Sequence, residues 1–199
     1  MNIKVDHIPV GAIRPAKKIN WTTITVHNTG NPESTALNER GWLTNPTNTR
    51  IASWNYCIYE DQIIEAIPEN EMSYHAGSRV GNETSLGVEI CEAGDFEKSV
   101  ETAVKFIAMK LHSKGKGIEA VKKHKDWSGK NCPRLLIPRW ESFIKAIEKE
   151  LTMISPDVVH WAEKPYQSLL KKGIHIHEKR FNDQITRGEV FALLDRIIK

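Results

Sequence analysis

The chain has 199 residues, of which 40% are hydrophobic and 27% are charged, and its formal net charge is +3. This composition is ordinary for a globular protein and is sufficient for a core without disulfides. No segment approaches the roughly 20 apolar residues of a membrane span. The mild basicity is compatible with an anionic polymer such as a cell wall, but the absence of a long Lys/Arg block disfavours nucleic-acid binding.

Residues 1–153 predict an α/β domain. Alternating β-branched residues at 21–27 predict a strand, and the next segment, 33–44, has a helical pattern. A hairpin is expected over 52–59 and 61–67, and a short buried strand over 85–91. Mixed strands followed by helices indicate one α/β domain that ends near residue 153.

Two amphipathic helices complete this domain. One carries Phe96, Val100, Val104, Ile107 and Leu111 at helical spacing, with Lys114-Gly115 at its end; the other follows Pro138 and carries Trp140, Phe143, Ile144, Ile147 and Leu151.

Residues 154–199 predict a small helical module. A helix is expected over 157–173, with Pro165 bending or interrupting it and Gly173 as its C-cap. The segment TRGE at 186–189 has the pattern of a capping box and begins a last helix. Two short helices form a marginal core, so this module is expected to need support from the first domain or from copies of itself.

The stretch HKDWSGKNCP, residues 124–133, combines metal-binding residue types in a polar run that we expect to be a flexible loop. His124 and Cys132 could share a metal only with a third ligand from elsewhere. His27 ends the first predicted strand, where a lone histidine is more often structural. Together the three would leave one position of a tetrahedral Zn²⁺ ion open, as in catalytic sites. Such an ion would lower the pKa of bound water to about 7.

The other two cysteines, Cys57 and Cys91, lie in apolar runs, WNYCIY and LGVEIC, and are predicted to be core thiols.

Five motifs in order, TVHNTG, SWNYCIY, SYHAG, LGVEIC and HKDWSGKNCP, resemble the N-acetylmuramoyl-L-alanine amidases of the type-2 amidase family. That family includes phage endolysins and peptidoglycan recognition proteins. The resemblance covers roughly residues 5–150. It implies a central mixed β-sheet flanked by helices, one Zn²⁺ ion, and hydrolysis of the amide bond between N-acetylmuramic acid and L-alanine in peptidoglycan.

The resemblance also implies roles for individual residues. His27, His124 and Cys132 correspond to the zinc ligands, Glu89 to a general base and Lys130 to a lysine that stabilises developing negative charge. Asn28, Trp54 and His75 are implied to bind substrate.

Several assignments have alternatives in the sequence. Trp54 is either a groove wall or core, and the Trp54-Asn55 pair stands where many family members have an aromatic residue and a histidine. Glu89 could instead pair structurally with a base such as Lys130. Asp126 could hold a turn or orient a ligand histidine.

Residues 156–199 resemble a single S-layer-homology-like repeat, a module that typically occurs in threes and binds anionic secondary cell-wall polymers. The resemblance implies polymer-binding roles for Trp161, Thr186, Arg187 and Glu189. In the alternative interpretation, Thr186 and Glu189 only cap a helix.

The sequence therefore predicts a zinc amidase with peptidoglycan as its partner and neither nucleic acid nor membrane. The first ten residues, MNIKVDHIPV, lack the apolar stretch of a signal peptide. We expect a phage or prophage endolysin that is made in the host cytoplasm and released to the wall by a holin. The main alternative is a recognition protein that binds peptidoglycan without cutting it; a structural zinc protein is a third.

Overall fold

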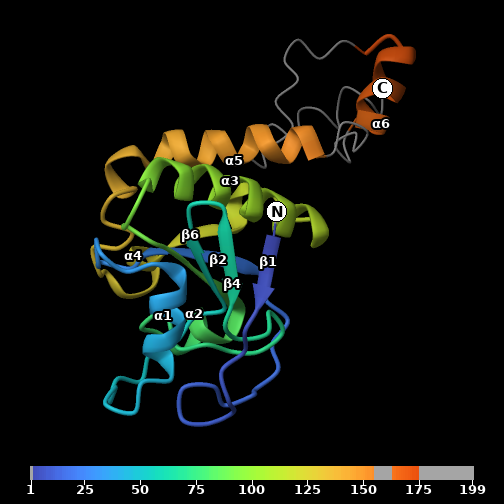
Figure 1. The fold of residues 1–199 in the computed structure, drawn as a ribbon. Coiled ribbons are helices and arrows are strands. Elements are labelled where there is room, and N and C mark those ends of the chain that lie inside the picture. Colours follow the sequence, from blue (N-terminus) through green and yellow to red (C-terminus); the bar gives the residue numbers. More distant parts are fainter. Residues whose placement is uncertain (1, 155–162, 175–199) are drawn as a thin grey trace. The chain divides into compact units, whose positions relative to one another are not determined.

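The computed structural model describes residues 2–154 and 163–174 (Figure 1). The chain divides into two compact units, Met1–Ser155 and Pro156–Lys199. Within the described residues, no helix is both long enough and apolar enough to cross a lipid bilayer.

The first unit is built on a six-stranded mixed sheet in the order β1-β4-β3-β5-β2-β6. The strands are β1 (Asn2–Val5), β2 (Thr23–Asn28), β3 (Tyr56–Tyr59), β4 (Gln62–Glu65), β5 (Ser85–Ile90) and β6 (Val121–Lys123). Neighbouring strands are parallel except for the β3–β4 pair, which is antiparallel. The predicted mixed sheet and the predicted hairpin are both confirmed.

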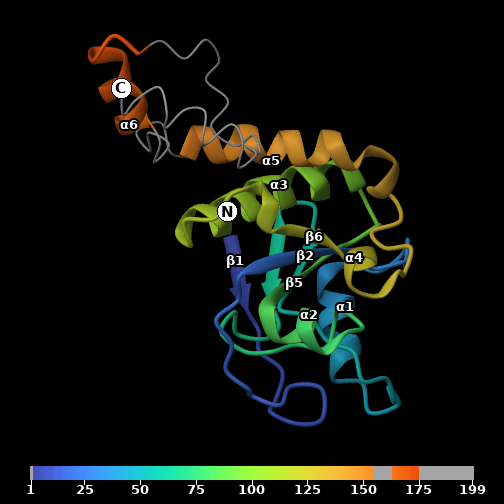
Figure 2. The same cartoon turned by 180° about the vertical axis from the view of Figure 1, so that it is seen from behind.

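Helices cover both faces of the sheet. They are α1 (Ala36–Leu43), α2 (Arg79–Thr84), α3 (Phe96–Ser113), α4 (His124–Ser128) and α5 (Trp140–Ile154), with 3-10 turns η1 (Ile118–Ala120) and η2 (Ile137–Arg139). Figures 1 and 2 show α3 and α5 side by side on one face, with α1 and α2 on the other. The two long amphipathic helices are therefore confirmed.

The alternation along β2 separates the core from the functional face. Ile24 and Val26 are fully buried in the larger apolar cluster, which α3 and α5 cover. Thr25 and His27 point to the opposite face because successive side chains of a strand alternate. The same alternation on β5 places Glu89 on the face of His27. One face of the central strands is thus apolar, while the other carries buried polar groups.

The second apolar cluster lies under α1 and contains Trp54 and both predicted core thiols. Cys57 and Cys91 are fully buried, with their sulfur atoms 3.4 Å apart. The prediction of core thiols is confirmed.

Four short elements were not predicted: β1, β6, α2 and α4. The most consequential is α4, because residues 124–133 were expected to form a flexible loop. Instead, His124 begins a helical turn that ends at Gly129, whose φ of 77° is the left-handed conformation that glycine adopts readily. Only the residues after Gly129 form a loop, so the prediction was wrong for the first half of the segment.

The described part of the second unit is α6 (Glu163–Lys171). Pro165 lies in the first turn of α6, where proline is tolerated. The first part of the predicted helix, 157–162, lies outside the described residues, so its bending at Pro165 stays a prediction. Gly173 has a φ of 76° and follows the helix end, as expected for a C-cap. The predicted polymer-binding residues Trp161, Thr186, Arg187 and Glu189 lie outside the described residues.

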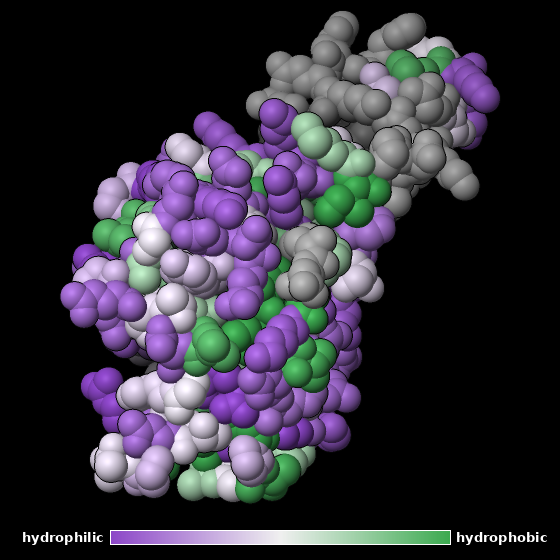
Figure 3. All heavy atoms as spheres, in the orientation of Figure 1, coloured by the Kyte–Doolittle hydropathy of each residue, from purple (hydrophilic) through white to green (hydrophobic). Residues whose placement is uncertain are grey.

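Polar residues predominate on the face shown in Figure 3, with smaller apolar areas between them. Among the described residues, the exposed large apolar side chains are scattered: Val5, Val10, Leu37, Ile51, Val80, Met153 and Ile154. Isolated apolar side chains of this kind are normal on a protein surface.

Phe106 allows a test of the core. Its ring is fully buried under the sheet and lies 4.8 Å from the ring of Tyr56. Phe106→Ala should lower the free energy of unfolding by about 3–5 kcal/mol, because it removes buried area and leaves a cavity. Urea denaturation measures this change. The control Lys105→Ala, at the exposed preceding position, should change stability by less than about 0.5 kcal/mol; equal effects would contradict this packing.

Candidate metal centre and active site

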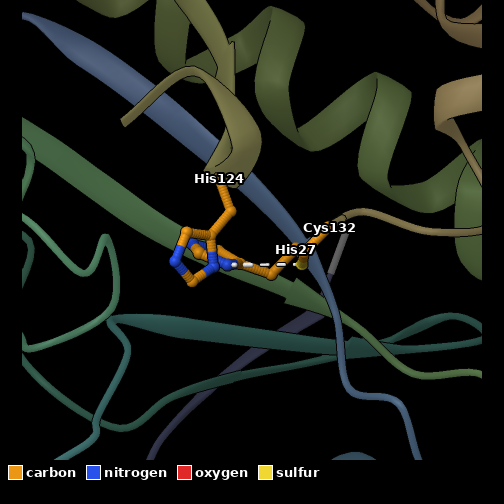
Figure 4. A group of neighbouring side chains, drawn as sticks. All are labelled: His27, His124 and Cys132. Atoms are coloured by element: carbon orange, nitrogen blue, oxygen red, sulfur yellow. Dashed lines mark hydrogen bonds between the residues drawn. The ribbon is translucent and has the colours of Figure 1, made fainter. Parts of the chain in front are cut away.

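Two imidazoles and a thiol converge at the carboxyl ends of the central parallel strands. His27, His124 and Cys132 each offer a ligand atom within 4.8 Å of the others, and all three residues are buried. Figure 4 shows His27 coming from β2, His124 from the start of α4 and Cys132 from the following loop. They lie in the lining of a cavity of about 610 Å³, together with Glu89 and Lys130.

The register of two parallel strands places Glu89 beside His27. These residues are direct partners across the β2–β5 pair, and the Glu89 Oε1 atom lies 4.0 Å from His27 Nδ1. The Glu89 Oε2 atom is buried and has no hydrogen-bond partner among the described residues. Burial raises the pKa of this carboxyl to about 8, assisted by nearby Glu39 and opposed by Lys130.

His124 is positioned by contacts on both sides of α4. The Asp126 carboxylate accepts a hydrogen bond of 2.8 Å from the Lys123 backbone N–H, which closes the helix start. Trp127 donates its Nε1–H to Thr25 Oγ1 at 2.8 Å and ties α4 to β2. Of the two roles open for Asp126 in the sequence, these contacts support the helix cap.

The loop that carries Cys132 is held by Asn28. The Asn28 side-chain oxygen accepts the Leu135 N–H at 3.0 Å, and its backbone oxygen lies 4.0 Å from the Cys132 sulfur. Arg134 adds an ion pair with buried Glu92 at the end of β5. Asn28 also lines the cavity. Its implied substrate-binding role stays a prediction, and its observed contacts fix the loop.

His75 lines the cavity and contacts His27. One ring nitrogen, Nδ1, is 3.0 Å from His27 Nε2, and the other, Nε2, is 3.2 Å from the Ser85 carbonyl oxygen. Burial lowers the pKa of His75 to about 4. Its implied substrate-binding role stays a prediction, but both of its nitrogens already have protein partners.

Trp54 and Asn55 take separate roles. Trp54 is 5% exposed, stacks on Trp42 with ring centroids 5.8 Å apart, and also lines the cavity, so it is both core and wall. Asn55 is fully buried and donates its amide to the carbonyls of Pro68 and Glu71 at 3.1 and 3.0 Å. Asn55 therefore joins the chain segments beneath the site and does not face the cavity.

Lys130 is exposed at the cavity rim. Its positive charge contributes to lowering the pKa of His27 and His124 and opposes the burial that raises the pKa of Glu89. A cation at this place can act on an anionic group in the cavity without being tied to a protein carboxylate, since the described residues include no ion pair with it.

Sequence reasoning missed part of the cavity wall: Glu39, Trp42, Arg50, Ile51 and Tyr74. Glu39 and Trp42 come from α1, and Arg50 and Ile51 from the loop after it. Tyr74 stands in the SYHAG motif, whose histidine alone was singled out. No spacing in the sequence brings these segments together, because they meet only through tertiary packing.

The residues present fit a zinc ion. His124 Nδ1 is buried and has no hydrogen-bond partner among the described residues, so its lone pair is available to a ligand. Burial lowers the pKa of His124 to about 4 and that of His27 well below its usual value, so both are neutral near pH 7. Burial raises the pKa of Cys132 to about 11, and a bound cation would favour its thiolate. Neutral imidazole and thiolate are preferred zinc ligands.

The family model described as N-acetylmuramoyl-L-alanine amidase, Amidase_2, matches residues 17–135. The chain belongs to this family. It is 39% identical over 150 residues to N-acetylmuramoyl-L-alanine amidase XlyA of Bacillus subtilis (strain 168), which covers 72% of this chain and 50% of that protein. It is 37% identical over 137 residues to XlyB of the same organism, covering 64% and 42%. The chain thus spans about half the length of these curated relatives.

Solved structures agree with the fold. The catalytic domain of XlyA matches with a TM-score of 0.70 and 39% identity, covering 74% of this chain and 99% of that one. The structure of PlyL matches with a TM-score of 0.68 and 30% identity, covering 75% and 99%. The fold predicted from the family resemblance, a central mixed sheet flanked by helices, is confirmed.

Glu89→Gln should stabilise the metal-free protein, and more strongly as the pH rises. A carboxyl whose pKa is raised from 4.5 to about 8 on folding contributes stability that is complete below pH 4.5 and is lost as the pH rises through about 8. Each pKa unit corresponds to about 1.4 kcal/mol, so the difference from the native chain should reach on the order of 3–5 kcal/mol at pH 9.

Urea denaturation in the presence of a chelator, from pH 5 to pH 9, measures this difference. The contributions of titrating groups remote from Glu89 are common to both proteins and cancel. Glu101→Gln on the exposed face of α3 is the matched control and should give a pH-independent difference near zero. A flat difference for Glu89→Gln would contradict the burial of this carboxyl.

Proposed function

We propose that this chain is a zinc-dependent N-acetylmuramoyl-L-alanine amidase that hydrolyses the bond between the lactyl group of muramic acid and L-alanine in peptidoglycan. The observation that carries the proposal is the His27, His124 and Cys132 group in a cavity that also contains Glu89 and Lys130. Three ligand residues leave room for substrate or water, as catalytic zinc sites require. The match to the amidase family supports the choice of this bond.

His27, His124 and Cys132 would hold the zinc ion, which when bound would supply Lewis-acid polarisation of the scissile carbonyl and a lower pKa for a water molecule. Glu89 takes a proton from the attacking water and returns it to the departing nitrogen. The new C–O bond forms first and moves an electron pair onto the carbonyl oxygen; the C–N bond then breaks as the nitrogen receives the proton, which gives a lactyl carboxylic acid and a free alanine amine. The unpartnered Glu89 Oε2 atom, buried in the site, supports this role.

Lys130 stabilises the negative charge that develops on the carbonyl oxygen. Its ammonium group is at the rim of the cavity and has no carboxylate partner among the described residues. A positive charge aimed at a developing oxyanion acts mainly on the transition state, and therefore on kcat.

The wall formed by Trp42 and Trp54 offers a flat apolar surface to the glycopeptide.

We further propose that the protein is an endolysin that reaches the wall after release from a host cytoplasm. In support, a solved structure titled as a mutant endolysin from Bacillus subtilis is 38% identical and has a TM-score of 0.70. Binding of a secondary cell-wall polymer by an S-layer-homology-like module at 154–199, through Trp161, Thr186, Arg187 and Glu189, remains part of this proposal and rests on sequence resemblance alone.

A digest of purified peptidoglycan tests the reaction. The native protein should release new alanine amino termini without new reducing sugar ends, and a chelator should abolish this release until Zn²⁺ is restored. Lys130→Ala should lower kcat by about 10²- to 10³-fold, and Glu89→Gln by about 10²- to 10⁴-fold, while both still bind zinc.

Lys125→Ala is the matched control for Lys130→Ala, because Lys125 is also exposed on the same segment but lies outside the cavity lining. It should keep native turnover. If the native protein sediments with the wall but releases neither product, the amidase proposal fails and the chain is a peptidoglycan-binding module.

A further inference from the structure

Three groups next to the candidate zinc site, the Ser85 carbonyl and the rings of His75 and His27, are connected in series by hydrogen bonds. The Ser85 carbonyl oxygen lies 3.2 Å from His75 Nε2, and His75 Nδ1 lies 3.0 Å from His27 Nε2. The two rings meet nearly perpendicularly, at 88°, with centroids 5.2 Å apart. All three groups are buried, so water does not compete for these bonds.

The Ser85 carbonyl determines which nitrogen donates and which accepts in each hydrogen bond of this series. A carbonyl oxygen can only accept, so His75 must carry its proton on Nε2. In a neutral imidazole the other nitrogen, Nδ1, is then an acceptor. His27 must therefore donate from its own Nε2, which leaves a lone pair on His27 Nδ1.

That lone pair lies next to the candidate zinc ligand Cys132 and the proposed base Glu89. His27 Nδ1 lies 3.7 Å from the Cys132 sulfur and 4.0 Å from the Glu89 carboxylate. The opposite tautomer would place a hydrogen on Nδ1, where a cation could not bind. A metal-ligating histidine typically has its second nitrogen fixed by such a partner.

We propose that His75 is a positioning residue that holds His27 in the tautomer protonated on Nε2 and so prepares Nδ1 to bind zinc. The inference rests on the zinc site of the proposed function and adds to it a residue that acts on the metal through His27. The Ser85 carbonyl is the fixed end of the arrangement, because it belongs to the backbone of β5.

Two neighbouring residues, Asn82 and Gly87, fix the position of the His75 ring. The Asn82 side-chain oxygen accepts the backbone N–H groups of His75 and Ala76 at 3.0 and 2.8 Å. Gly87 provides the space for the ring, since a Cβ atom there would lie 2.8 Å from His75 Cγ. Gly87 in LGVEIC and Asn82 in α2 thus both position His75.

The first test determines the tautomer directly in the 199-residue protein without substitutions. Long-range ¹H–¹⁵N correlation spectra of the metal-free protein near pH 7 should show His27 and His75 both protonated on Nε2. A His27 ring protonated on Nδ1 would overturn the proposal, with no variant required to fold.

The second test measures zinc affinity by competition with a chromophoric chelator. His75→Phe keeps a ring but removes the acceptor, and it should weaken zinc binding by about 10- to 100-fold. His75→Asn places an amide oxygen the same number of bonds from the backbone as Nδ1, and it should recover part of the loss. His7→Phe removes a half-buried histidine outside the cavity lining and should leave the affinity unchanged.

The outcomes separate this inference from the proposed function. Zinc affinity of His75→Phe within about threefold of native would overturn the positioning role and leave the amidase proposal intact. Equal weakening in the Phe and Asn variants, in parallel with a lower melting temperature of both metal-free proteins, would show a packing role and also overturn it. If the native protein binds no zinc, the proposed function fails, while the spectra still decide the tautomer.

Discussion

The site depends on the register between two parallel strands. His27 on β2 is paired with Glu89 on β5, and the same register turns Val26 and Val88 into the apolar core. A shift of one residue would move every side chain of a strand to the opposite face. The hydrophobic pattern that stabilises the sheet against α3 and α5 therefore also determines which polar groups meet on the other face.

This arrangement places polar groups in an environment that opposes their charged forms. Desolvation lowers the pKa of His27 and of His75, and it raises the pKa of Glu89 and of Cys132. Each change favours the neutral state in the metal-free protein. A divalent cation would reverse the balance for the acid and the thiol while requiring no change in the imidazoles. The buried polar face is thus costly without a cation and suited to receive one.

The sequence predicted the long, strongly periodic elements and the residues that meet at the site. The α3 and α5 helices, the hairpin and the central strands all have clear hydrophobic patterns. The pattern did not reveal β6 or α4, because three or five residues are too short to show a period. Nor could it show that Glu39 on α1 raises the pKa of Glu89, since the proximity of the two residues depends on how α1 packs on the sheet. The interaction of His75 with His27 was hidden for the same reason: the residues are 48 positions apart.

The contacts divide the site into a part that is tied to the sheet and a part that is supplied by a loop. His27, His75 and Glu89 are fixed by backbone register and by a carbonyl of β5, and His124 is fixed by the bond from Trp127 to Thr25 on β2. By contrast, Arg50 and Ile51 on the far wall come from an exposed connection between α1 and β3. Loop substitutions can alter the wall without disturbing strand pairing. Substitutions in the α1–β3 connection should accordingly change the shape of the cavity wall, whereas metal affinity should depend on the strand register and on the contacts that hold α4 and the Cys132 loop.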